Sequence, residues 1–118
     1  MIARYHIDML TPATIQQITD RIVDRFNPEK IILFGSYARG EAHPHSDLDL
    51  LIVMETLAPR GQRSAPILKM LAQDYAEPID VVVRSTQALK NWQQVPGSFA
   101  HQVINEGIVL YDRQKQPV

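Results

Sequence analysis

The sequence of 118 residues contains no cysteine, which excludes disulfide bridges and thiolate metal sites. It also has no long apolar run, because no stretch approaches the roughly 20 residues that a membrane-spanning helix needs. Residues 1–8 lack the long apolar centre of a signal peptide. Together these absences predict a cytoplasmic protein that makes no contact with a membrane.

The sequence also lacks a surplus of positive charge. Its 12 lysine and arginine residues are matched by 13 aspartate and glutamate residues, which gives a formal net charge of −1. Domains dedicated to nucleic-acid binding usually carry a clear basic surplus. The composition therefore argues against a nucleic-acid-binding module, and no direct binding to nucleic acid is expected.

Apolar spacing divides the chain into alternating helical and extended segments. The length is typical of one domain, expected over 1–118 with a loose polar tail at 114–118. Thr11 before Pro12 predicts the start of a first helix, and Asn27 predicts its end. Further helices are expected after Ser64 (reaching Tyr75), after Ser85 and after Ser98, with Gly107 at the C′ position of the last; strands are expected at 30–34, 48–54, 79–83 and 108–111.

Three aspartates stand in these strand patterns. Asp47 and Asp49 are two residues apart, so in a strand they share one face at a separation of roughly 6.6–6.8 Å, while Leu48 and Leu50 point into the core. Asp80 lies inside the next apolar strand and adds a third carboxylate if that strand is a neighbour with the same facing. Three carboxylates so close repel one another unless cations intervene, and carboxylates are preferred ligands of Mg²⁺. The pattern favours a magnesium site whose ions activate a hydroxyl and stabilise a leaving pyrophosphate.

The phosphate end of the site is predicted at Gly35 and Ser36, and ten residues separate Ser36 from Asp47. Glycine lets a backbone approach a ligand closely, and the serine hydroxyl adds a donor. If Ser36 lies at a helix start, free N–H groups and the helix dipole attract an anion, although residues 36–40 are equally compatible with a turn. Arg39 is a candidate to pair with a phosphate, with a plain surface arginine as the alternative. Combined with the acids, this segment predicts nucleotidyl transfer.

The residues GSYARGEAHPHSDLDLLIV, with PIDVVV downstream, resemble the minimal nucleotidyltransferase family of the polymerase-β-type nucleotidyltransferase superfamily. The resemblance covers most of the chain. It implies an α/β fold with a mixed β-sheet flanked by helices, and magnesium-dependent transfer from ATP. Carried over to this sequence, Gly35 and Ser36 contact the nucleotide phosphates, and Asp47, Asp49 and Asp80 hold two Mg²⁺.

Members of this family are often encoded beside HEPN-domain proteins as toxin–antitoxin pairs. The resemblance therefore implies an antitoxin that transfers AMP from ATP to a tyrosine of a HEPN ribonuclease toxin, within a hetero-oligomer. Two alternatives remain: the same chemistry on a small hydroxyl compound such as an aminoglycoside, and an antitoxin that acts by binding alone. The sequence is not expected to contain an acceptor-binding domain, which weighs against transfer to a small hydroxyl compound. The complete set of three acids weighs against an antitoxin that acts by binding alone.

Several other polar residues near these motifs are open to a functional interpretation. His43 and His45 suggest metal ligands, but solvated loop histidines are the favoured interpretation. Arg60, Arg63 and Lys69 are candidates to line the nucleotide pocket or to face a partner, and ordinary surface charge is favoured for all three.

Three large apolar residues are candidate contacts with a protein acceptor. These are Leu57, Trp92 and Phe99. Core packing is the expected role of at least two of them.

Overall fold

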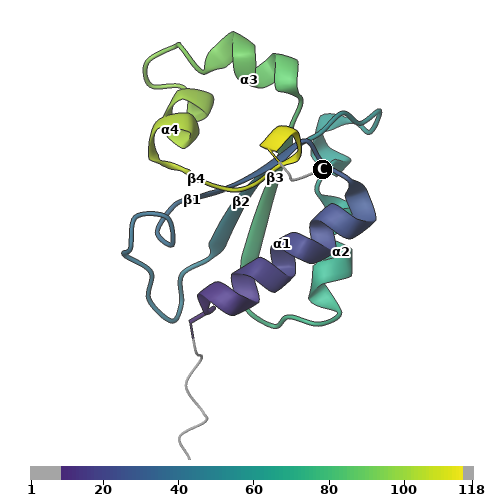
Figure 1. The fold of residues 1–118 in the computed structure, drawn as a ribbon, viewed down its shortest axis with the longest axis vertical. Coiled ribbons are helices and arrows are strands. Elements are labelled where there is room, and N and C mark those ends of the chain that lie inside the picture. The colour runs from purple at the N-terminus through teal and green to yellow at the C-terminus, as the bar shows by residue number, and fades with distance from the viewer. Residues whose placement is uncertain (1–8, 116–118) are drawn as a thin grey trace, which may run out of the picture.

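A computed structural model describes residues 9–115 of the chain, and these form a single four-stranded sheet with helices on both faces (Figure 1). Neighbouring strands follow the order β3-β2-β1-β4. Strand β1 is antiparallel to β2 and β4, whereas β2 and β3 are parallel, so the predicted mixed sheet is confirmed. The strands are β1 (Lys30–Phe34), β2 (Leu48–Val53), β3 (Ile79–Arg84) and β4 (Ile108–Asp112).

The α-helices of the described residues form a layer on each face of the sheet. Helices α1 and α2 pack against one face, and α3 and α4 pack against the other (Figure 1). None of the helices within 9–115 has the length and apolar character needed to cross a membrane. The helices are α1 (Pro12–Phe26), α2 (Ala65–Ala72), α3 (Thr86–Trp92) and α4 (Phe99–Glu106), with 3₁₀ turns at Arg60–Gln62 and Arg113–Lys115.

Short polar side chains set the helix starts, as the sequence predicts. The Thr11 hydroxyl accepts a hydrogen bond from the N–H of Thr14 at 3.1 Å, and Ser85 and Ser98 cap α3 and α4 in the same way. Asn27 ends α1 in the left-handed conformation, with a φ of 48°. Local sequence therefore fixes the starts of three helices and the end of α1.

Helix α2 differs from the prediction at both ends. Ser64 makes no side-chain hydrogen bond to the helix, although it was expected to cap it. The helix ends at Ala72 and does not reach Tyr75. The N–H groups of Gln73 and Asp74 instead form i→i−3 hydrogen bonds, to the carbonyls of Met70 and Leu71. The extension to Tyr75 is therefore wrong, but its ring still packs against the core.

Gly107 ends α4 for a reason other than left-handed geometry. Its φ of −79° is one that any residue adopts. A Cβ at this position would lie 2.5 Å from Cγ2 of Ile32 and 2.5 Å from the carbonyl oxygen of Val103. Glycine is therefore required by the close approach of α4 to β1.

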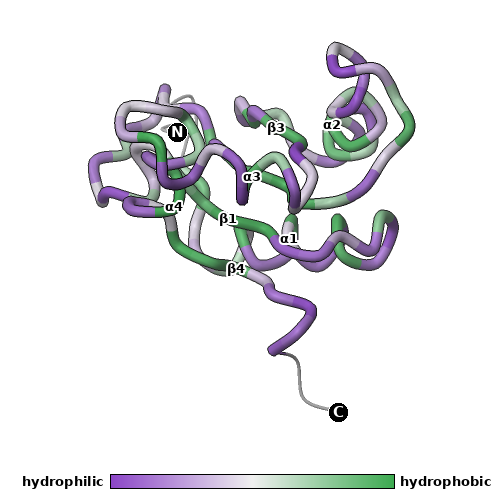
Figure 2. The backbone as a smooth tube through the Cα atoms, turned by 90° about the horizontal axis from the view of Figure 1, so that it is seen from above, coloured by the Kyte–Doolittle hydropathy of each residue, from purple (hydrophilic) through white to green (hydrophobic). Residues whose placement is uncertain are grey.

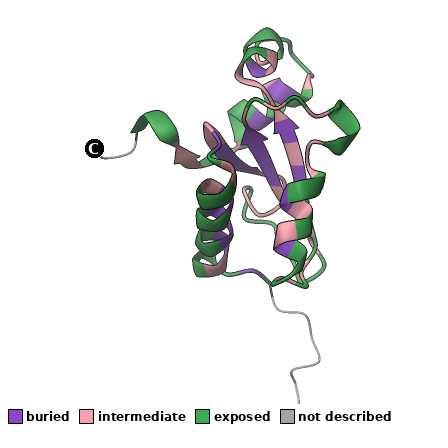
Figure 3. Cartoon of the chain, turned by 90° about the vertical axis from the view of Figure 1, so that its right-hand side faces the viewer, coloured by how far each residue is buried: buried purple, intermediate pink, exposed green. Residues whose placement is uncertain are grey.

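The sheet separates two apolar clusters, and strand alternation assigns each strand residue to one of them. Figure 2 shows that hydrophobic residues are concentrated along the central strand β1. Leu48 and Leu50 are fully buried toward α1 and α2, as predicted, whereas Leu51 and Val53 pack toward α3 and α4. Burial is concentrated in the strands (Figure 3). In β2, the side chain of Asp49 points to the same face as that of Leu51 and to the opposite face from that of Leu50. It therefore lies on the α3–α4 face of the sheet.

The expectations for the two termini fall mainly outside the described residues. Residues 1–8, where a signal peptide was judged absent, and residues 116–118 of the expected loose tail are not described. The first two residues of that tail, Gln114 and Lys115, belong to a 3₁₀ turn.

Candidate active site

The parallel pairing of β2 with β3 brings together two of the predicted acids. Asp49 and Asp80 are register partners, so their side chains share a face of the sheet. Asp47 lies two residues ahead of Asp49, immediately before β2 begins. Asp49 is half-buried, while Asp47 and Asp80 are exposed. The structure therefore places all three acids where β2 and β3 start.

The charges of these acids act on one another. The pKa of Asp49 is raised above its ordinary value of 3.8, first by burial and then by the negative charges of Asp80 and Asp47. The positive charge of Arg39 acts in the opposite direction. Ionised Asp49 is thus held in an unfavourable environment that a nearby cation would relieve.

The residues fit Mg²⁺ in charge and donor type. Carboxylate oxygens are the ligands that this ion prefers, and the three acids repel one another without it. Within 9–115, however, no three histidine, aspartate or glutamate side chains converge closely enough to form a ready-made metal group. Binding of one ion by all three acids therefore requires rotation of their side chains.

Gly35 is in direct contact with the acid site. It follows Phe34, the register partner of Asp49, and has a φ of +77°. A Cβ at position 35 would lie 2.2 Å from Oδ2 of Asp49. Glycine is therefore needed both for the backbone conformation and for room beside the carboxylate. The second reason is invisible in the sequence, because it depends on the β1–β2 register.

Residues 36–40 form hydrogen-bonded turns, so the alternative of a helix starting at Ser36 is wrong. The N–H groups of Ala38 and Arg39 both donate to the carbonyl of Gly35 at 3.1 Å. Gly40 then adopts a φ of +71°, which interrupts any helical continuation. The segment curls over the end of β1 and leads back toward β2 through the loop.

The turn nevertheless presents backbone donors. The N–H groups of Ser36 and Tyr37 make no hydrogen bond to another residue in the described part of the chain. Successive free N–H groups in a turn form a concave site suited to an anion.

The side chain of Tyr37 packs against the core, and its hydroxyl accepts a hydrogen bond from the N–H of Leu10 at 3.0 Å.

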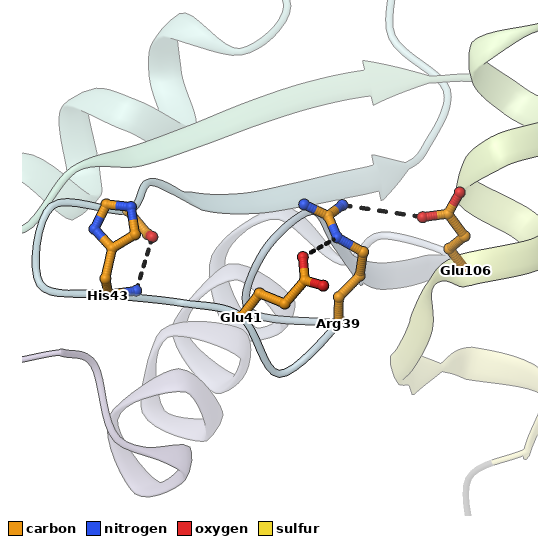
Figure 4. Close-up of polar contacts among 5 residues, drawn as sticks. Arg39, Glu41, His43 and Glu106 are labelled. Atoms are coloured by element: carbon orange, nitrogen blue, oxygen red, sulfur yellow. Dashed lines mark hydrogen bonds and ion pairs between the residues drawn. The ribbon is translucent and has the colours of Figure 1, made fainter.

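Arg39 points from this turn toward α4 (Figure 4). Its Nε donates to Oε1 of Glu41 at 2.8 Å, and its Nη1 lies 3.9 Å from Oε1 of Glu106. The pKa of Arg39 is raised chiefly by Glu41, with smaller contributions from the charges of Glu106 and Asp49. Sequence reasoning missed Glu106, because nothing local in the sequence indicates that α4 approaches the turn.

A cavity of about 170 Å³ opens beside the guanidinium of Arg39. Gly35 and Phe34 at the end of β1 line one side, and Phe99 and Glu106 of α4 line the other. The cavity adjoins the turn at Gly35, which in turn adjoins the carboxylate of Asp49.

The two loop histidines are exposed, in line with the favoured interpretation. Nδ1 of His43 accepts a hydrogen bond from the N–H of His45 at 3.2 Å, and the N–H of His43 donates to the Ser46 hydroxyl at 2.9 Å. Figure 4 shows His43 well separated from Arg39 along the loop. Neither histidine belongs to a group of metal ligands among residues 9–115.

The expectation that at least two of the three large apolar residues pack in the core is wrong. Leu57, Trp92 and Phe99 are 104%, 57% and 38% exposed. Phe99 is the best packed, with its ring edge-on to Phe34 at a centroid distance of 5.3 Å. Leu57 lies in a loop, and Trp92 is the last residue of α3.

Residues 16–116 match the family described as "Polymerase beta, Nucleotidyltransferase", and the chain belongs to this family. The resemblance seen in the sequence is therefore confirmed, and the protein is a nucleotidyltransferase. A Methanocaldococcus jannaschii protein named "Putative protein adenylyltransferase MJ0604" is 36% identical over 83 residues, which cover 70% of this chain and 78% of the relative. A second protein of that organism with the same kind of name is 32% identical over 80 residues, covering 68% and 76%.

Solved structures share the fold. A crystal structure described as a toxin–antitoxin with AMP-PNP has a TM-score of 0.58 and 23% identity, over 84% of this chain and 74% of that one. A structure from Sulfolobus solfataricus described as a "putative nucleotidyltransferase" has a TM-score of 0.57 and 20% identity, over 88% and 82%. These similarities confirm the predicted polymerase-β-type fold.

Proposed function

We propose that this chain is a magnesium-dependent protein adenylyltransferase that transfers AMP from ATP to a tyrosine of a HEPN-type ribonuclease toxin, and so acts as its antitoxin. The observation that carries the proposal is the register of Asp49 with Asp80, directly beside the Gly35 turn. The name of the 36% identical relative supports a protein acceptor. One of the structures with this fold is described as a toxin–antitoxin, which agrees with a protein partner.

In the proposed reaction, the tyrosine oxygen forms a bond to the α-phosphorus of ATP. The bond from that phosphorus to the oxygen bridging to the β-phosphate breaks, and pyrophosphate leaves with the electron pair. Asp80 is exposed and takes the hydroxyl proton, provided that the acceptor comes within about 2.6–3.2 Å of its carboxylate or a water bridges them. The product is an AMP ester of tyrosine.

Each residue of the site has a stated role in this reaction. Asp47, Asp49 and Asp80 would hold two Mg²⁺, which would stabilise the phosphate charge and lower the pKa of the attacking hydroxyl. The free N–H groups of the turn after Gly35 bind the triphosphate, together with the Ser36 hydroxyl.

Arg39 is proposed to exchange Glu41 for a phosphate oxygen when ATP binds. Its present partners are carboxylates, which compete with phosphate for the same donors. The guanidinium is exposed enough to move, and it already lines the cavity beside Gly35.

The proposal is tested by incubating this chain with ATP, Mg²⁺ and a HEPN ribonuclease encoded next to it. Intact-mass spectrometry is expected to show one or more added AMP groups on the ribonuclease, with a matching loss of its activity. Full inhibition by the chain with Asp47, Asp49 and Asp80 replaced by Asn, in the absence of ATP, would instead show an antitoxin that acts by binding alone. Modification of a small hydroxyl compound and of no protein would favour the small-substrate transferase.

A further inference from the structure

A second and larger cavity lies on the α3–α4 side of the sheet. Its volume is about 490 Å³, and it lies between α3, the start of α4 and the end of β3. Its walls carry three arginines, Arg60, Arg63 and Arg84, and two aromatic residues, Trp92 and Phe99. Arg60 and Arg63 were interpreted from the sequence as ordinary surface charge, and Arg84 was not noticed.

The three arginines have no carboxylate partner among the described residues. No acidic side chain lines the cavity, and none of the three forms an ion pair with another residue in the range 9–115. Burial, followed by the charges of Arg60 and Arg63, lowers the pKa of Arg84. Three like charges around one cavity repel one another, and a bound anion would relieve this repulsion.

Most guanidinium donors in this cavity remain free. Arg84 uses Nη1 to donate to the carbonyl of Val83 at 2.9 Å, and Arg63 uses Nε to donate to the carbonyl of Ala58 at 3.1 Å. Each guanidinium therefore keeps further N–H groups, in the planar fork that matches a phosphate group. The half-buried position of Arg84 strengthens such bonds by excluding part of the water.

Aromatic rings complete the lining. Trp92 lines the cavity and is 57% exposed. The guanidinium carbon of Arg84 lies 5.9 Å from the ring centroid of Phe99. Aromatic and guanidinium planes next to phosphate donors are the arrangement with which proteins bind a base and its phosphate together.

This cavity is distinct from the acid site. Asp80 and Arg84 lie on the same face of β3. They are four residues apart, so their Cα atoms are separated by about 13 Å along the strand. Phe99 stands between the two regions, because it lines both the arginine cavity and the smaller cavity beside Gly35 and Arg39.

We propose that the arginine cavity is a second nucleotide-binding site, in which Arg60, Arg63 and Arg84 bind the phosphate of a mononucleotide and its base stacks on Trp92. The site is separate from the turn after Gly35. The inference does not rest on the function proposed above, because it requires neither Mg²⁺ nor an acceptor protein.

Trp92 is the only tryptophan of the chain, so its fluorescence reports directly on this cavity. AMP added to the full chain in the presence of a chelator is expected to change this fluorescence saturably. Adenosine is expected to bind at least about tenfold more weakly, because it lacks the charged hydrogen-bond acceptor. Inorganic phosphate is expected to compete with AMP. Equal binding of adenosine and AMP would overturn the proposal.

Substitutions separate this site from the rest of the surface. The double variant Arg60→Gln/Arg63→Gln is expected to weaken AMP binding by at least about tenfold, and Arg84→Lys by a smaller factor, since the charge stays but the fork is lost. Arg21→Gln is the matched control, because Arg21 lies on α1 and pairs with Asp74. Unchanged AMP binding in the Arg60/Arg63 variant would contradict the assignment.

A donor-site variant distinguishes the two cavities. The double variant Ser36→Ala/Arg39→Gln removes two side-chain hydrogen-bond donors from the turn after Gly35. It is expected to leave the change of Trp92 fluorescence on AMP addition unchanged. Loss of that response would show that the arginine cavity is part of the ATP donor site, and would overturn the proposal. A response to a glutamate-rich peptide but not to AMP would assign the cavity to an acidic protein segment instead.

Discussion

Gly35 and the carboxylate of Asp49 occupy adjoining space, so that a Cβ at position 35 would lie 2.2 Å from Oδ2 of Asp49. The contact joins the turn after β1 to the acid of β2 through the register of Phe34 with Asp49. Any side chain at position 35 must displace the carboxylate. The turn and the acid site are therefore one structural unit.

Gly35→Ala is expected to reduce nucleotidyl transfer by about 100-fold, since a displacement of about 1 Å in a catalytic group has an effect of this size. Gly40→Ala is the matched control: Gly40 also has a positive φ, but apart from its chain neighbours no described residue has an atom within 4 Å of its Cβ position. Both variants are expected to lose about 1–2 kcal/mol of unfolding free energy from backbone strain. Denaturant unfolding and transfer rates measure the two effects, and equal activity in both variants would contradict this role of Gly35.

Asp49→Asn is expected to leave the metal-free protein at least as stable as the wild type at pH 7. The folded state raises the pKa of Asp49 above 3.8, so ionising Asp49 costs stability as pH rises from near 3.8 through the raised pKa. The advantage of the Asn variant should therefore vanish at lower pH, where Asp49 is protonated in both the folded and unfolded states. Thermal unfolding between acidic and neutral pH measures this, with Asp24→Asn on the exposed face of α1 as control.

An Asn variant that is less stable than the wild type at pH 7, by a difference that does not change at acidic pH, would show that Asp49 is stabilised by partners and not strained by its neighbours.

The double variant Asp47→Asn/Asp49→Asn should in addition lose transfer activity while keeping its fold. Wild-type transfer in that variant would exclude these acids from catalysis.

Asp80→Ala is expected to slow the chemical step much more than it weakens ATP binding. Asp80 is exposed and is the register partner of Asp49 on the neighbouring strand. From this position its carboxylate can reach both a metal ion and the acceptor. Single-turnover rates and ATP affinity separate the two effects. A collapse of ATP affinity with normal turnover at saturation would assign Asp80 to nucleotide binding alone.

Glu41→Gln is expected to increase ATP affinity, because Arg39 must leave the Glu41 carboxylate before it binds phosphate. Arg39→Gln should lower the affinity by about 10- to 100-fold, the range for a hydrogen bond to a charged group. In the Arg39→Gln background, Glu41→Gln should have no further effect on nucleotide titrations. An effect that persists there would mean that Glu41 acts without Arg39.

The sequence predicted features that depend on neighbouring residues. The cap at Thr11, the strand Lys30–Phe34 and the alternation of Leu48 with Asp49 are local properties, and all are confirmed. The glycine requirement at Gly107 was predicted for the wrong reason, because crowding against Ile32 is set by tertiary packing.

The arrangement of the site depended on contacts between distant segments. Glu106 reaches Arg39 only because α4 packs beside β1, and the arginine cavity exists only because α3 and α4 lie near the end of β3. The 57% exposure of Trp92 at the end of α3 depends on the same arrangement. Composition and spacing carry no signal for such relationships.

The most direct test of the account is transfer from ATP labelled either at the α-phosphate or at the γ-phosphate. Nucleotidyl transfer at Asp47, Asp49 and Asp80 predicts that only the α-label moves to the acceptor protein, that pyrophosphate is released in equal amount, and that Asp49→Asn abolishes both. Transfer of the γ-label, or undiminished α-label transfer by a variant that lacks all three acids, would contradict the account.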